Sequence, residues 1–562
     1  MPKTDYYVPD NRLWFKLYDE GVGRHLDYPE VPLYAFLDKA AKEHPENIAL
    51  SYFGTEISYK DYKDLVDRFA HALQKNGIQK GDRVIIMAIN CPQVVISIFG
   101  TIKAGAIPVP LNPLYTAKEL EYFFKDIEPR IIVTPDNFYY NVLEASKVTP
   151  SLEKIISTNI SDYFPFFKKY IARILGKVRV VKCEEATDFK DFIDTSPEYN
   201  EVKIDPKEDL ALIVYTGGTT DEPKGVMLTH YNITANIVNF EEWFKNIKVE
   251  SCVLVVPLFH IYGSGPIINF MNSRAGKIVM LPKFHTEETI KELQKHKING
   301  LFCVPAIYAA FVKYYQEHPN EPKLINVNFC TSGSTSISSY VWQGLQKIVP
   351  NAFLIEGYGS SETCPAVIMD PADNKYDKRM NSVGVPLPDV DVKIDDLITG
   401  EELPPNSSGE IVIRGPSVFK GYWRKPEKTN SVLKNGWFYT NDIGRMDQDG
   451  VFYIEGRKDD MINVRGEKVW PREVEAVLEQ NPKVLDVAVI GVASDYYGQA
   501  IKACIVLKHG YDSSEKEIIE YCKEKIIPYK VPHMVEFFKE LPKSNLGKTI
   551  HSQLRKRENG KK

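Results

Sequence analysis

A segment rich in glycine, threonine and lysine follows the apolar run at residues 211–215. Gly217 and Gly218 let the backbone approach an anionic oxygen closely, and Lys224 adds a cation. The residues that supply hydroxyl donors or a ligand for Mg²⁺ are Thr216, Thr219 and Thr220. This composition predicts a phosphate-binding loop over residues 216–225, with a polar turn between a strand and a helix as the alternative.

The spacing within this loop disfavours a Walker-type NTPase. Five residues separate Gly218 from Lys224, and Gly225 follows the lysine, so the GxxxxGK[ST] pattern is absent. The loop instead resembles the signature of the ANL superfamily of adenylate-forming enzymes. That superfamily contains acyl-CoA synthetases, peptide-synthetase adenylation domains and firefly-type luciferases. The usual loop has glycine where this chain has Asp221.

The resemblance extends over nearly the whole chain, and residues 105–113 look most like the fatty-acid-activating branch. It implies ATP and Mg²⁺ as cofactors and CoA as co-substrate. The implied reaction joins ATP and a carboxylate into an acyl-adenylate with release of pyrophosphate. The CoA thiol then displaces AMP, so no nucleophile of the protein is required.

Residues 357–363 resemble the adenine and metal segment of the superfamily. By this resemblance Tyr358 stacks on adenine and Glu362 helps to hold Mg²⁺. Thr219 is the second candidate metal ligand, and both Glu362 and Thr219 are candidate catalytic residues. The neighbours assigned to the same nucleotide site are Gly357, Gly359, Ser360 and Ser361. Without the resemblance, a surface turn is the simpler interpretation.

Two further segments match the nucleotide site. Gly333 and Ser334 lie in a small-residue segment that the superfamily places beside adenine and the acyl group. Asp442 matches the aspartate that accepts hydrogen bonds from the ribose, and Arg457 would approach the same sugar. Asn441 replaces the usual glycine. A solvated surface charge is the alternative for Asp442 and Arg457.

Lys548 is the leading catalytic candidate, because residues 541–550 resemble the C-terminal signature that ends in a catalytic lysine. A compact ammonium offsets the repulsion between the carboxylate and the α-phosphate as they approach. Asp459 matches the hinge that rotates the C-terminal lid, and the loop around Gly466 would shape the CoA tunnel. His260 matches an element near the acyl pocket, to which Gly333 also belongs, although a packed core histidine fits almost as well.

The pattern of elements predicts an α/β protein. Short apolar runs, such as residues 83–87 and 130–134, alternate with helical periodicity at residues 62–75 and 286–296, which indicates parallel α/β layers. From about Val390 shorter polar-apolar strands indicate a small β-rich subdomain. We therefore predict an N-terminal adenylation domain of stacked sheets over residues 1–456 and a mobile α+β lid over residues 457–562, with the hinge near Asp459.

Composition limits the partners and the compartment. The chain has 562 residues, a net charge of −5 and a pI near 6.2, which gives no overall field for nucleic acid. Eight scattered cysteines and the lack of a leader-like start predict a cytoplasmic protein. Residues 251–273 are long enough to cross a bilayer, but their prolines and glycines favour a strand, a loop and a buried helix.

An insertion-like segment at residues 162–175 carries the apolar residues Phe164, Phe167, Ile171, Ile174 and Leu175, which can share one helical face. Lys169 and Arg173 would lie opposite. The favoured interpretation is a helix packed on the body, and the alternative is a weak contact with a membrane surface.

The predicted function is an AMP-forming acyl-CoA ligase for a carboxylic acid, with a fatty acid as the expected substrate. Two alternatives share the ATP motifs. One is an adenylating enzyme that loads a carrier protein, and the other is a nucleotide-binding relative without turnover. A homodimer is a further expectation.

Overall fold

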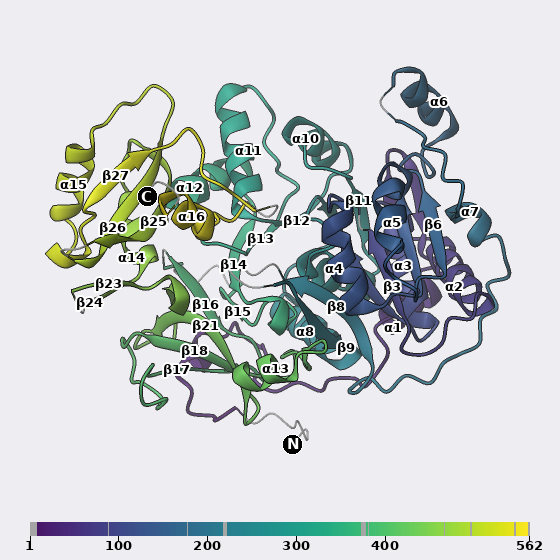
Figure 1. The fold of residues 1–562 in the computed structure, drawn as a ribbon, viewed down its shortest axis with the longest axis horizontal. Helices are drawn as coiled ribbons and strands as arrows, with labels where there is room; N and C mark the ends of the chain where they lie inside the picture. Colours follow the sequence, from purple (N-terminus) through teal and green to yellow (C-terminus); the bar gives the residue numbers. More distant parts are fainter. Residues whose placement is uncertain are drawn as a thin grey trace.

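The computed structural model describes residues 8–87, 89–176, 178–216, 222–372, 378–379, 381–465, 467–494, 497–544 and 547–559. Figure 1 shows α/β layers in the larger part of the chain and a smaller unit at the C-terminal end. The predicted α/β class is confirmed.

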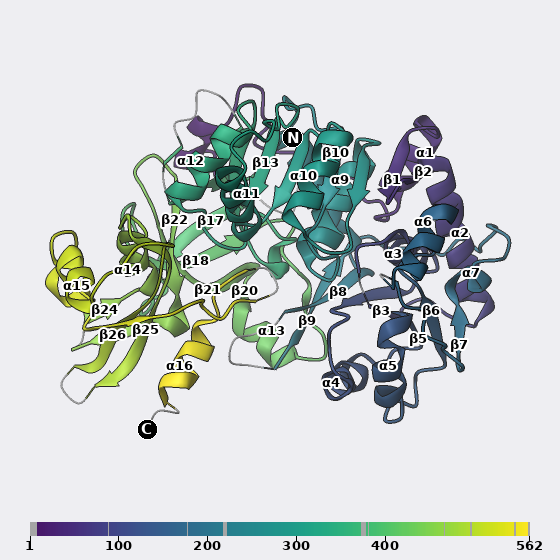
Figure 2. The same ribbon diagram turned by 90° about the horizontal axis from the view of Figure 1, so that it is seen from above.

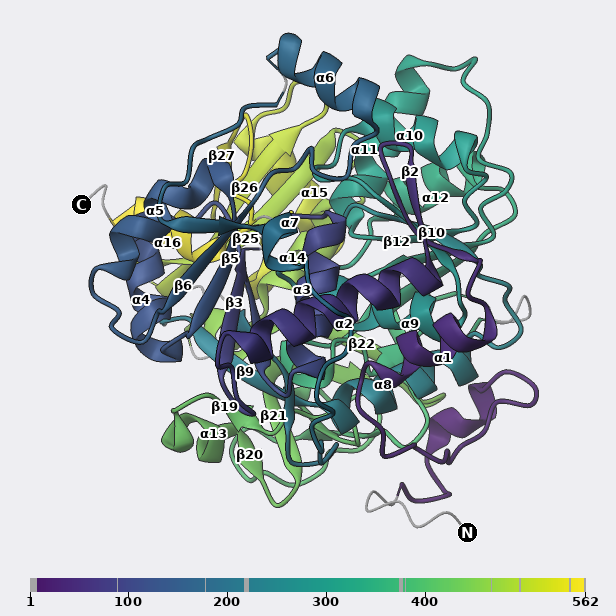
Figure 3. The ribbon, with the colours of Figure 1, turned by 90° about the vertical axis from the view of Figure 1, so that its right-hand side faces the viewer.

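A parallel sheet in the order β4-β3-β5-β6-β7 forms one layer. Its strands are β3 (Arg83–Met87), β4 (Ile107–Leu111), β5 (Ile131–Pro135), β6 (Lys154–Thr158) and β7 (Ala186–Asp188). Its helices are α2 (Tyr59–Lys75), α3 (Pro92–Lys103), α4 (Ala117–Ile127), α5 (Tyr139–Ser146), α6 (Phe166–Ile174) and α7 (Phe189–Phe192). In Figure 3 the strands β3, β5 and β6 lie between α4 and α5 on one side and α2 and α3 on the other.

Strand β3 is apolar throughout because both of its faces are buried. Val84 and Ile86 belong to the apolar cluster that contains residues of α2 and α3, whereas Ile85 and Met87 belong to the cluster that contains residues of α4. This arrangement is typical of parallel strands covered by helices on both sides.

A larger mixed sheet carries the site. Its order is β17-β18-β21-β22-β16-β15-β14-β13-β12-β10-β11-β1-β2, with β20 paired to β21. The strands on the side that is mainly parallel are β1 (Ile48–Tyr52), β2 (Thr55–Ser58), β10 (Ser251–Leu254), β11 (Lys277–Met280), β12 (Gly300–Cys303), β13 (Phe329–Ser332) and β14 (Phe353–Tyr358). The helices between or beside them are α1 (Ala35–Glu43), α9 (Ile268–Ser273), α10 (Thr286–Lys295), α11 (Pro305–Glu317) and α12 (Ser339–Ile348).

The other side of this sheet is antiparallel and contains the β-rich region predicted from about Val390. Its strands are β15 (Ile368–Met369), β16 (Ser382–Pro386), β17 (Asp391–Asp395), β18 (Gly409–Arg414), β20 (Leu433–Lys434), β21 (Trp437–Met446) and β22 (Phe452–Arg457), and the helix α13 (Pro426–Val432) precedes β20.

The strand that precedes the predicted phosphate loop differs from the expected parallel layer. β8 (Leu210–Thr216) pairs antiparallel with β9 (Lys224–Thr229), and β19 (Gly421–Tyr422) adds to β9. The loop therefore connects two strands of a hairpin, and the helix α8 (His230–Trp243) begins only after β9. Thr229 caps α8 by accepting a hydrogen bond from the backbone of Asn232 at 3.1 Å.

The C-terminal unit, residues 462–559, has its own sheet in the order β24-β23-β26-β25, with β27 paired to β26. Its elements are β23 (Ile462–Val464), β24 (Glu467–Val469), α14 (Pro471–Leu478), β25 (Val484–Ser494), β26 (Gly498–Leu507), α15 (Glu515–Lys523), β27 (Met534–Phe537) and α16 (His551–Asn559). Figure 2 shows this unit at one end of the molecule and the β3–β7 sheet at the other.

Within the described ranges, no helix combines the length and the apolar character needed to cross a bilayer. Residues 251–273 instead form β10, a turn and α9, and their buried residues include Phe270 and Met271. The prediction of a strand, a loop and a buried helix is confirmed.

The preference for a packed helix at residues 162–175 is wrong, because α6 has no buried residue. Phe164 also lies outside the helix, where its ring contacts Phe53 with centroids 4.5 Å apart. The amphipathic pattern is the same for a helix packed on the body and for one facing outward, so periodicity alone did not distinguish them.

Candidate active site

The carboxyl ends of β13 and β14 bring two predicted segments together. The strands are parallel and pair Ser332 with Glu356, so Gly333 and Tyr358 emerge at the same edge of the sheet. A cleft of about 2060 Å³ opens there. The predicted residues that line it are Thr216, Lys224, His260, Gly333, Ser334, Gly357, Tyr358, Gly359, Ser360, Ser361, Glu362, Asp442, Arg457, Asp459 and Lys548.

The remaining predicted residues lie outside the described ranges. They are Gly217, Gly218, Thr219, Thr220 and Gly466, and the departure at Asp221 lies there as well. The two ends of the phosphate loop are described: Thr216 and Lys224 are paired across the β8–β9 hairpin, and both line the cleft.

Tyr358, Asp442 and Arg457 form one hydrogen-bonded line. The Tyr358 hydroxyl donates to Asp442 Oδ2 at 2.7 Å, and Arg457 Nη1 donates to Asp442 Oδ1 at 2.7 Å. The register of β21 and β22 sets Asp442 opposite Arg457. Burial and the adjacent Asp442 carboxylate raise the pKa of Tyr358 well above its ordinary value, so the hydroxyl stays protonated and fixes the carboxylate.

Glu362 lies in a second polar group with Tyr422. The Tyr422 hydroxyl donates to Glu362 Oε1 at 2.9 Å, and Lys224 Nζ lies 5.4 Å from the centroid of the Tyr422 ring. Tyr422 was not predicted from the sequence. Its only signal was its place in the aromatic and glycine run at residues 419–423, which carries no spacing that points to a site.

Two buried hydroxyls in the cleft suit a ligand. Ser332 Oγ and Ser360 Oγ have no hydrogen-bond partner among the described residues. Among the described residues, a Cβ added to Gly333 would meet only the carbonyl oxygen of Gly357, at 3.6 Å, so the space beside Gly333 belongs to the cleft. Gly359 differs, because a Cβ there would lie 1.7 Å from the carbonyl oxygen of Pro365, and its small size serves chain packing.

The presence of Asn441 at a position where the superfamily usually has glycine has a structural explanation. Asn441 has φ of 62°, in the left-handed region that asparagine tolerates better than most residues. Its side chain also makes a contact that glycine cannot make, because Nδ2 donates to Asp459 Oδ2 at 2.6 Å. The residue before Asp442 is therefore bonded to the predicted hinge.

The turn that carries Lys548 lies against the larger part of the molecule. Ser544 N donates to the Lys548 carbonyl at 2.8 Å, and Gly547 adopts a φ of 75°. A Cβ on Gly547 would lie 2.6 Å from Cβ of Ala306 in α11. Lys548 is exposed and lines the cleft, so the C-terminal unit presents it on the side where Glu362 and Tyr358 lie.

His260 lies in the cleft as a neutral group. Burial lowers its pKa to about 4, so the ring carries no charge at neutral pH. It therefore adds shape and a hydrogen-bonding edge to the cleft rather than a cation for a carboxylate.

The donor set fits Mg²⁺ only with help from a bound phosphate. Among the described residues no group of three or more His, Cys, Asp or Glu side chains could hold a metal ion. Glu362 supplies one carboxylate in the cleft, and Mg²⁺ is usually held by one or two carboxylates together with substrate phosphates.

The comparisons with known proteins agree with this geometry. The family model of the AMP-binding enzyme matches residues 37–423, and that of the AMP-binding enzyme C-terminal domain matches residues 473–548. The chain belongs to the AMP-binding enzyme family. The predicted resemblance to adenylate-forming enzymes is thereby confirmed.

Relatives of this family member resemble it over almost their full length. A long-chain-fatty-acid–CoA ligase of Bacillus subtilis (strain 168) is 37% identical over 551 residues, which cover 96% of this chain and 97% of that protein. ATP-bound MatB from Rhodopseudomonas palustris has a TM-score of 0.81 at 26% identity, and apo MatB has 0.74 at 27% identity. Both comparisons cover 94% of this chain and 99% of the other.

Proposed function

We propose that this AMP-binding enzyme is an acyl-CoA ligase that activates a fatty acid with ATP and transfers the acyl group to CoA, releasing AMP and pyrophosphate. The observation that carries the proposal is the cleft shared by Tyr358, Glu362, Asp442, Arg457 and Lys548. The name of the Bacillus subtilis relative supports the fatty acid as the substrate class.

The nucleotide would lie beside the hydrogen-bonded residues Tyr358, Asp442 and Arg457. Asp442 can accept hydrogen bonds from ribose hydroxyls, since Tyr358 and Arg457 hold its carboxylate in place. The Tyr358 ring offers a face for adenine. Gly333, Ser334, Gly357, Gly359, Ser360 and Ser361 would contact the adenosine and the acyl group, and the loop from Thr216 to Lys224 would bind the phosphates.

In the first half-reaction a carboxylate oxygen of the acid attacks the α-phosphorus, and pyrophosphate leaves. Both reactants are anionic, so a cation beside the α-phosphate lowers the barrier. Lys548 would supply that charge from the C-terminal unit. Glu362 and Thr219 would hold Mg²⁺, which when bound neutralises phosphate charge.

In the second half-reaction the CoA sulfur attacks the acyl carbonyl carbon, AMP leaves and the thiol proton is released. We propose that the chain divides into a domain of residues 1–456 and a mobile lid of residues 457–562 that rotates about Asp459. The rotation would withdraw Lys548 and bring the loop around Gly466 to the CoA path. His260 and Gly333 would border the acyl group.

The close approach of Gly547 to Ala306 in α11 supports an adenylation-like arrangement for the present conformation, because it holds the Lys548 turn at the cleft.

The proposal is tested by CoA-dependent AMP release over saturated acids from acetate to palmitate, run with the parent enzyme and Lys548→Ala. We expect release with fatty acids and a loss of adenylation on the order of 100- to 1000-fold in the variant. Lys543→Ala is the control, because Lys543 also lines the cleft but pairs with Asp486 at 2.6 Å.

Three results would contradict parts of the proposal. If no acid supports AMP release, the ligase function fails. If Lys548→Ala adenylates the acid at the rate of the parent enzyme, the catalytic role proposed for Lys548 is wrong. Release that requires a carrier protein in place of CoA would favour the carrier-loading alternative. A cytoplasmic location and a homodimer stay predictions, which fractionation and light scattering would test.

A further inference from the structure

Helix α6 exposes a continuous apolar face. None of its residues is buried, and Phe166 and Phe167 are 79% and 78% exposed. The exposed apolar side chains of the helix and its C-cap are Phe166, Phe167, Tyr170, Ile171, Ile174 and Leu175. At 100° per residue the five within the helix occupy an arc of about 140°. Figures 1 and 3 show α6 at the outer edge of the molecule.

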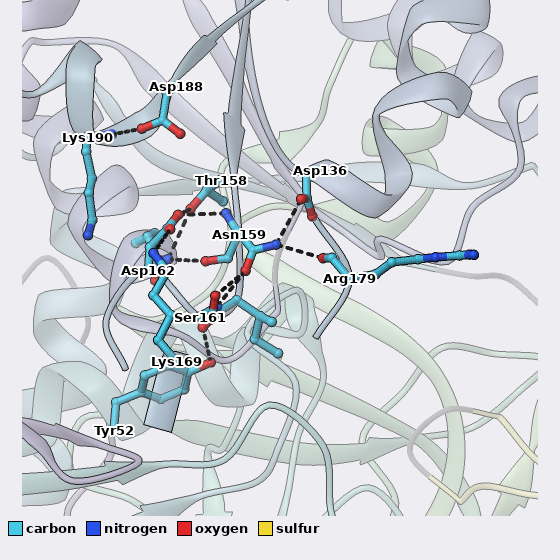
Figure 4. Close-up of polar contacts among 12 residues, drawn as sticks. Tyr52, Asp136, Thr158, Asn159, Ser161, Asp162, Lys169, Arg179, Asp188 and Lys190 are labelled. Carbon is cyan, nitrogen blue, oxygen red and sulfur yellow. Dashed lines mark hydrogen bonds and ion pairs between the residues drawn. The ribbon is translucent and has the colours of Figure 1, made fainter. Parts of the chain in front are cut away.

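The chain that leads into α6 is fixed to the body. Asp162 Oδ2 accepts a hydrogen bond from the backbone of Asn159 at 2.7 Å, and Asp162 Oδ1 pairs with Lys169 at 3.2 Å (Figure 4). Phe164 packs against Phe53, and Lys168 Nζ donates to the Phe53 carbonyl at 2.7 Å. These contacts turn the lysines toward the body and the apolar arc away from it.

The chain that leaves α6 is held by the same polar group. Asn159 Nδ2 donates to Asp136 Oδ2 at 2.8 Å and to the Arg179 carbonyl at 3.0 Å (Figure 4). Asp136 Oδ2 also accepts a hydrogen bond from the backbone of Val181 at 2.9 Å. Since Asn159 and Asp136 are both buried, the two ends of the segment are fixed in place while the helix between them stays exposed.

The segment that contains α6 has a net charge opposite in sign to that of the whole chain. Residues 163–183 contain the basic residues Lys168, Lys169, Arg173, Lys177, Arg179 and Lys182 and no acidic residue, although the whole chain has a net charge of −5. On the helix, Lys168 follows one edge of the apolar arc, and Lys169 and Arg173 follow the other. Basic groups beside an aromatic and aliphatic face complement an anionic lipid surface.

We propose that α6 docks on the surface of a bilayer that contains anionic lipids. The apolar arc would enter the headgroup and acyl boundary, and the exposed Arg173 and Arg179 would contact the lipid phosphates, because Lys168 and Lys169 face the body. The helix lies in the surface rather than across it, because nine residues span about 14 Å and a bilayer core is about 30 Å thick. Figures 1 and 2 show α6 at the opposite end from α15 and β25, so docking leaves the C-terminal unit unobstructed.

Co-sedimentation of the full chain with vesicles tests the proposal without any need for enzymatic activity. The vesicles contain phosphatidylcholine with or without phosphatidylglycerol. We expect binding to the anionic vesicles that weakens with salt and falls at least about tenfold in the double variant Phe166→Glu, Phe167→Glu. The matched control is Ile325→Glu, Ile398→Glu, because these residues are also exposed, at 61% and 85%, but lie in connecting segments away from α6, between α11 and β13 and between β17 and β18.

A second readout follows the helix itself. Trypsin cleavage after Arg173 and Arg179 should slow in the presence of anionic vesicles, with no slowing by phosphatidylcholine alone. The double variant should keep the AMP release of the parent enzyme with a water-soluble acid in the absence of vesicles. Binding equal in the parent and the double variant would overturn the proposal. So would a parent dimer that the double variant converts to a monomer without any vesicle binding, because α6 would then contact a second copy.

Discussion

At the residue scale, the candidate site depends on how neighbours fix single polar groups. Asp442 is held from two sides, by Tyr358 and by Arg457, and Glu362 is held by Tyr422. A carboxylate fixed in this way needs little reorganisation when a ribose or a metal binds, and such preorganisation is a main source of binding and catalysis in enzymes.

Replacing Tyr358 with phenylalanine tests the contribution of its hydrogen bond to Asp442. The change keeps the ring that is proposed to face adenine but removes the hydroxyl that donates to Asp442. We expect the KM for ATP to rise about tenfold, since a hydrogen bond to a charged group contributes about 1.5–3 kcal/mol. ATP–pyrophosphate exchange measures the effect. Tyr453→Phe is the control, because its hydroxyl donates to Asp447 outside the cleft. Equal KM values would contradict the role of the Tyr358 hydroxyl.

His230 gives a pH prediction. Burial lowers its pKa to about 4, and its Nδ1 accepts a hydrogen bond from Leu33 N at 3.0 Å. Between about pH 6.5 and 4 the unfolded chain binds a proton that the folded chain does not. The free energy of unfolding therefore falls as pH falls, by up to about 1.4 kcal/mol per pH unit from this group.

Melting temperatures at pH 7 and pH 5 check this sign. His230→Gln removes the titration but keeps an oxygen that can accept the hydrogen bond from Leu33. The drop in melting temperature from pH 7 to pH 5 should be smaller in the variant than in the parent. An equal drop in both would show that His230 is not the group responsible.

At the element scale, the hairpin β21–β22 connects the proposed nucleotide site to the proposed hinge. Its two strands carry Asp442 and Arg457, and η5 (Lys458–Asp460) follows directly. Two contacts then fix the hinge segment to the β-rich region: Asn441 bonds to Asp459, and Lys458 pairs with Glu410 at 3.0 Å.

Asn441→Gly should loosen this connection without straining the backbone. Glycine accepts the φ of 62°, but the hydrogen bond to Asp459 is lost. If rotation about Asp459 precedes thioester formation, the thioester should form about two- to tenfold faster from preformed acyl-adenylate and CoA. This range corresponds to the loss of a hydrogen bond that contributes about 0.5–1.5 kcal/mol. Rapid-quench measurement of the thioester checks it.

The control is Asn435→Gly, the same change at a residue with a φ of 52° in the turn between β20 and β21. It should leave the rate of thioester formation unchanged. A rate that is the same in Asn441→Gly and the parent would argue against a hinge at Asp459.

At the scale of the whole molecule, the two parts of the chain meet at the cleft, and Gly547 is one of the points of contact. In the proposed mechanism, the site is complete only when the C-terminal unit brings Lys548 to residues on β14, β21 and β22. A change at the contact should therefore affect catalysis more than stability.

Gly547→Val tests this dependence. The added side chain would meet Ala306 and push the Lys548 turn away from α11, so adenylation should fall on the order of 100-fold, as expected for a displacement of about 1 Å. Gly510→Val is the matched control: Gly510 has a similar φ of 82°, and a Cβ there meets no atom of the described part of the chain within 4 Å. Pyrophosphate exchange and melting temperature are measured for both. Equal losses of exchange in the two variants would point to backbone strain alone.

Much of the fold could be predicted from the sequence, because parallel strands buried on both faces, such as β3, are apolar throughout and helices such as α2 show a regular period. The antiparallel hairpin at β8 and β9 was not predicted, since a buried run has the same composition in either orientation. The outward position of α6 was not predicted either, because amphipathic periodicity does not say which medium faces the apolar side.

The sequence by itself pointed to the family and the candidate residues, because its separate motifs resemble those of adenylate-forming enzymes. Only the tertiary structure decided which of them meet. The pairing of Asp442 with Tyr358, of Glu362 with Tyr422 and of Asn441 with Asp459 joins residues 84, 60 and 18 positions apart. Such contacts depend on strand register and on the docking of separate elements, which local residue patterns do not encode.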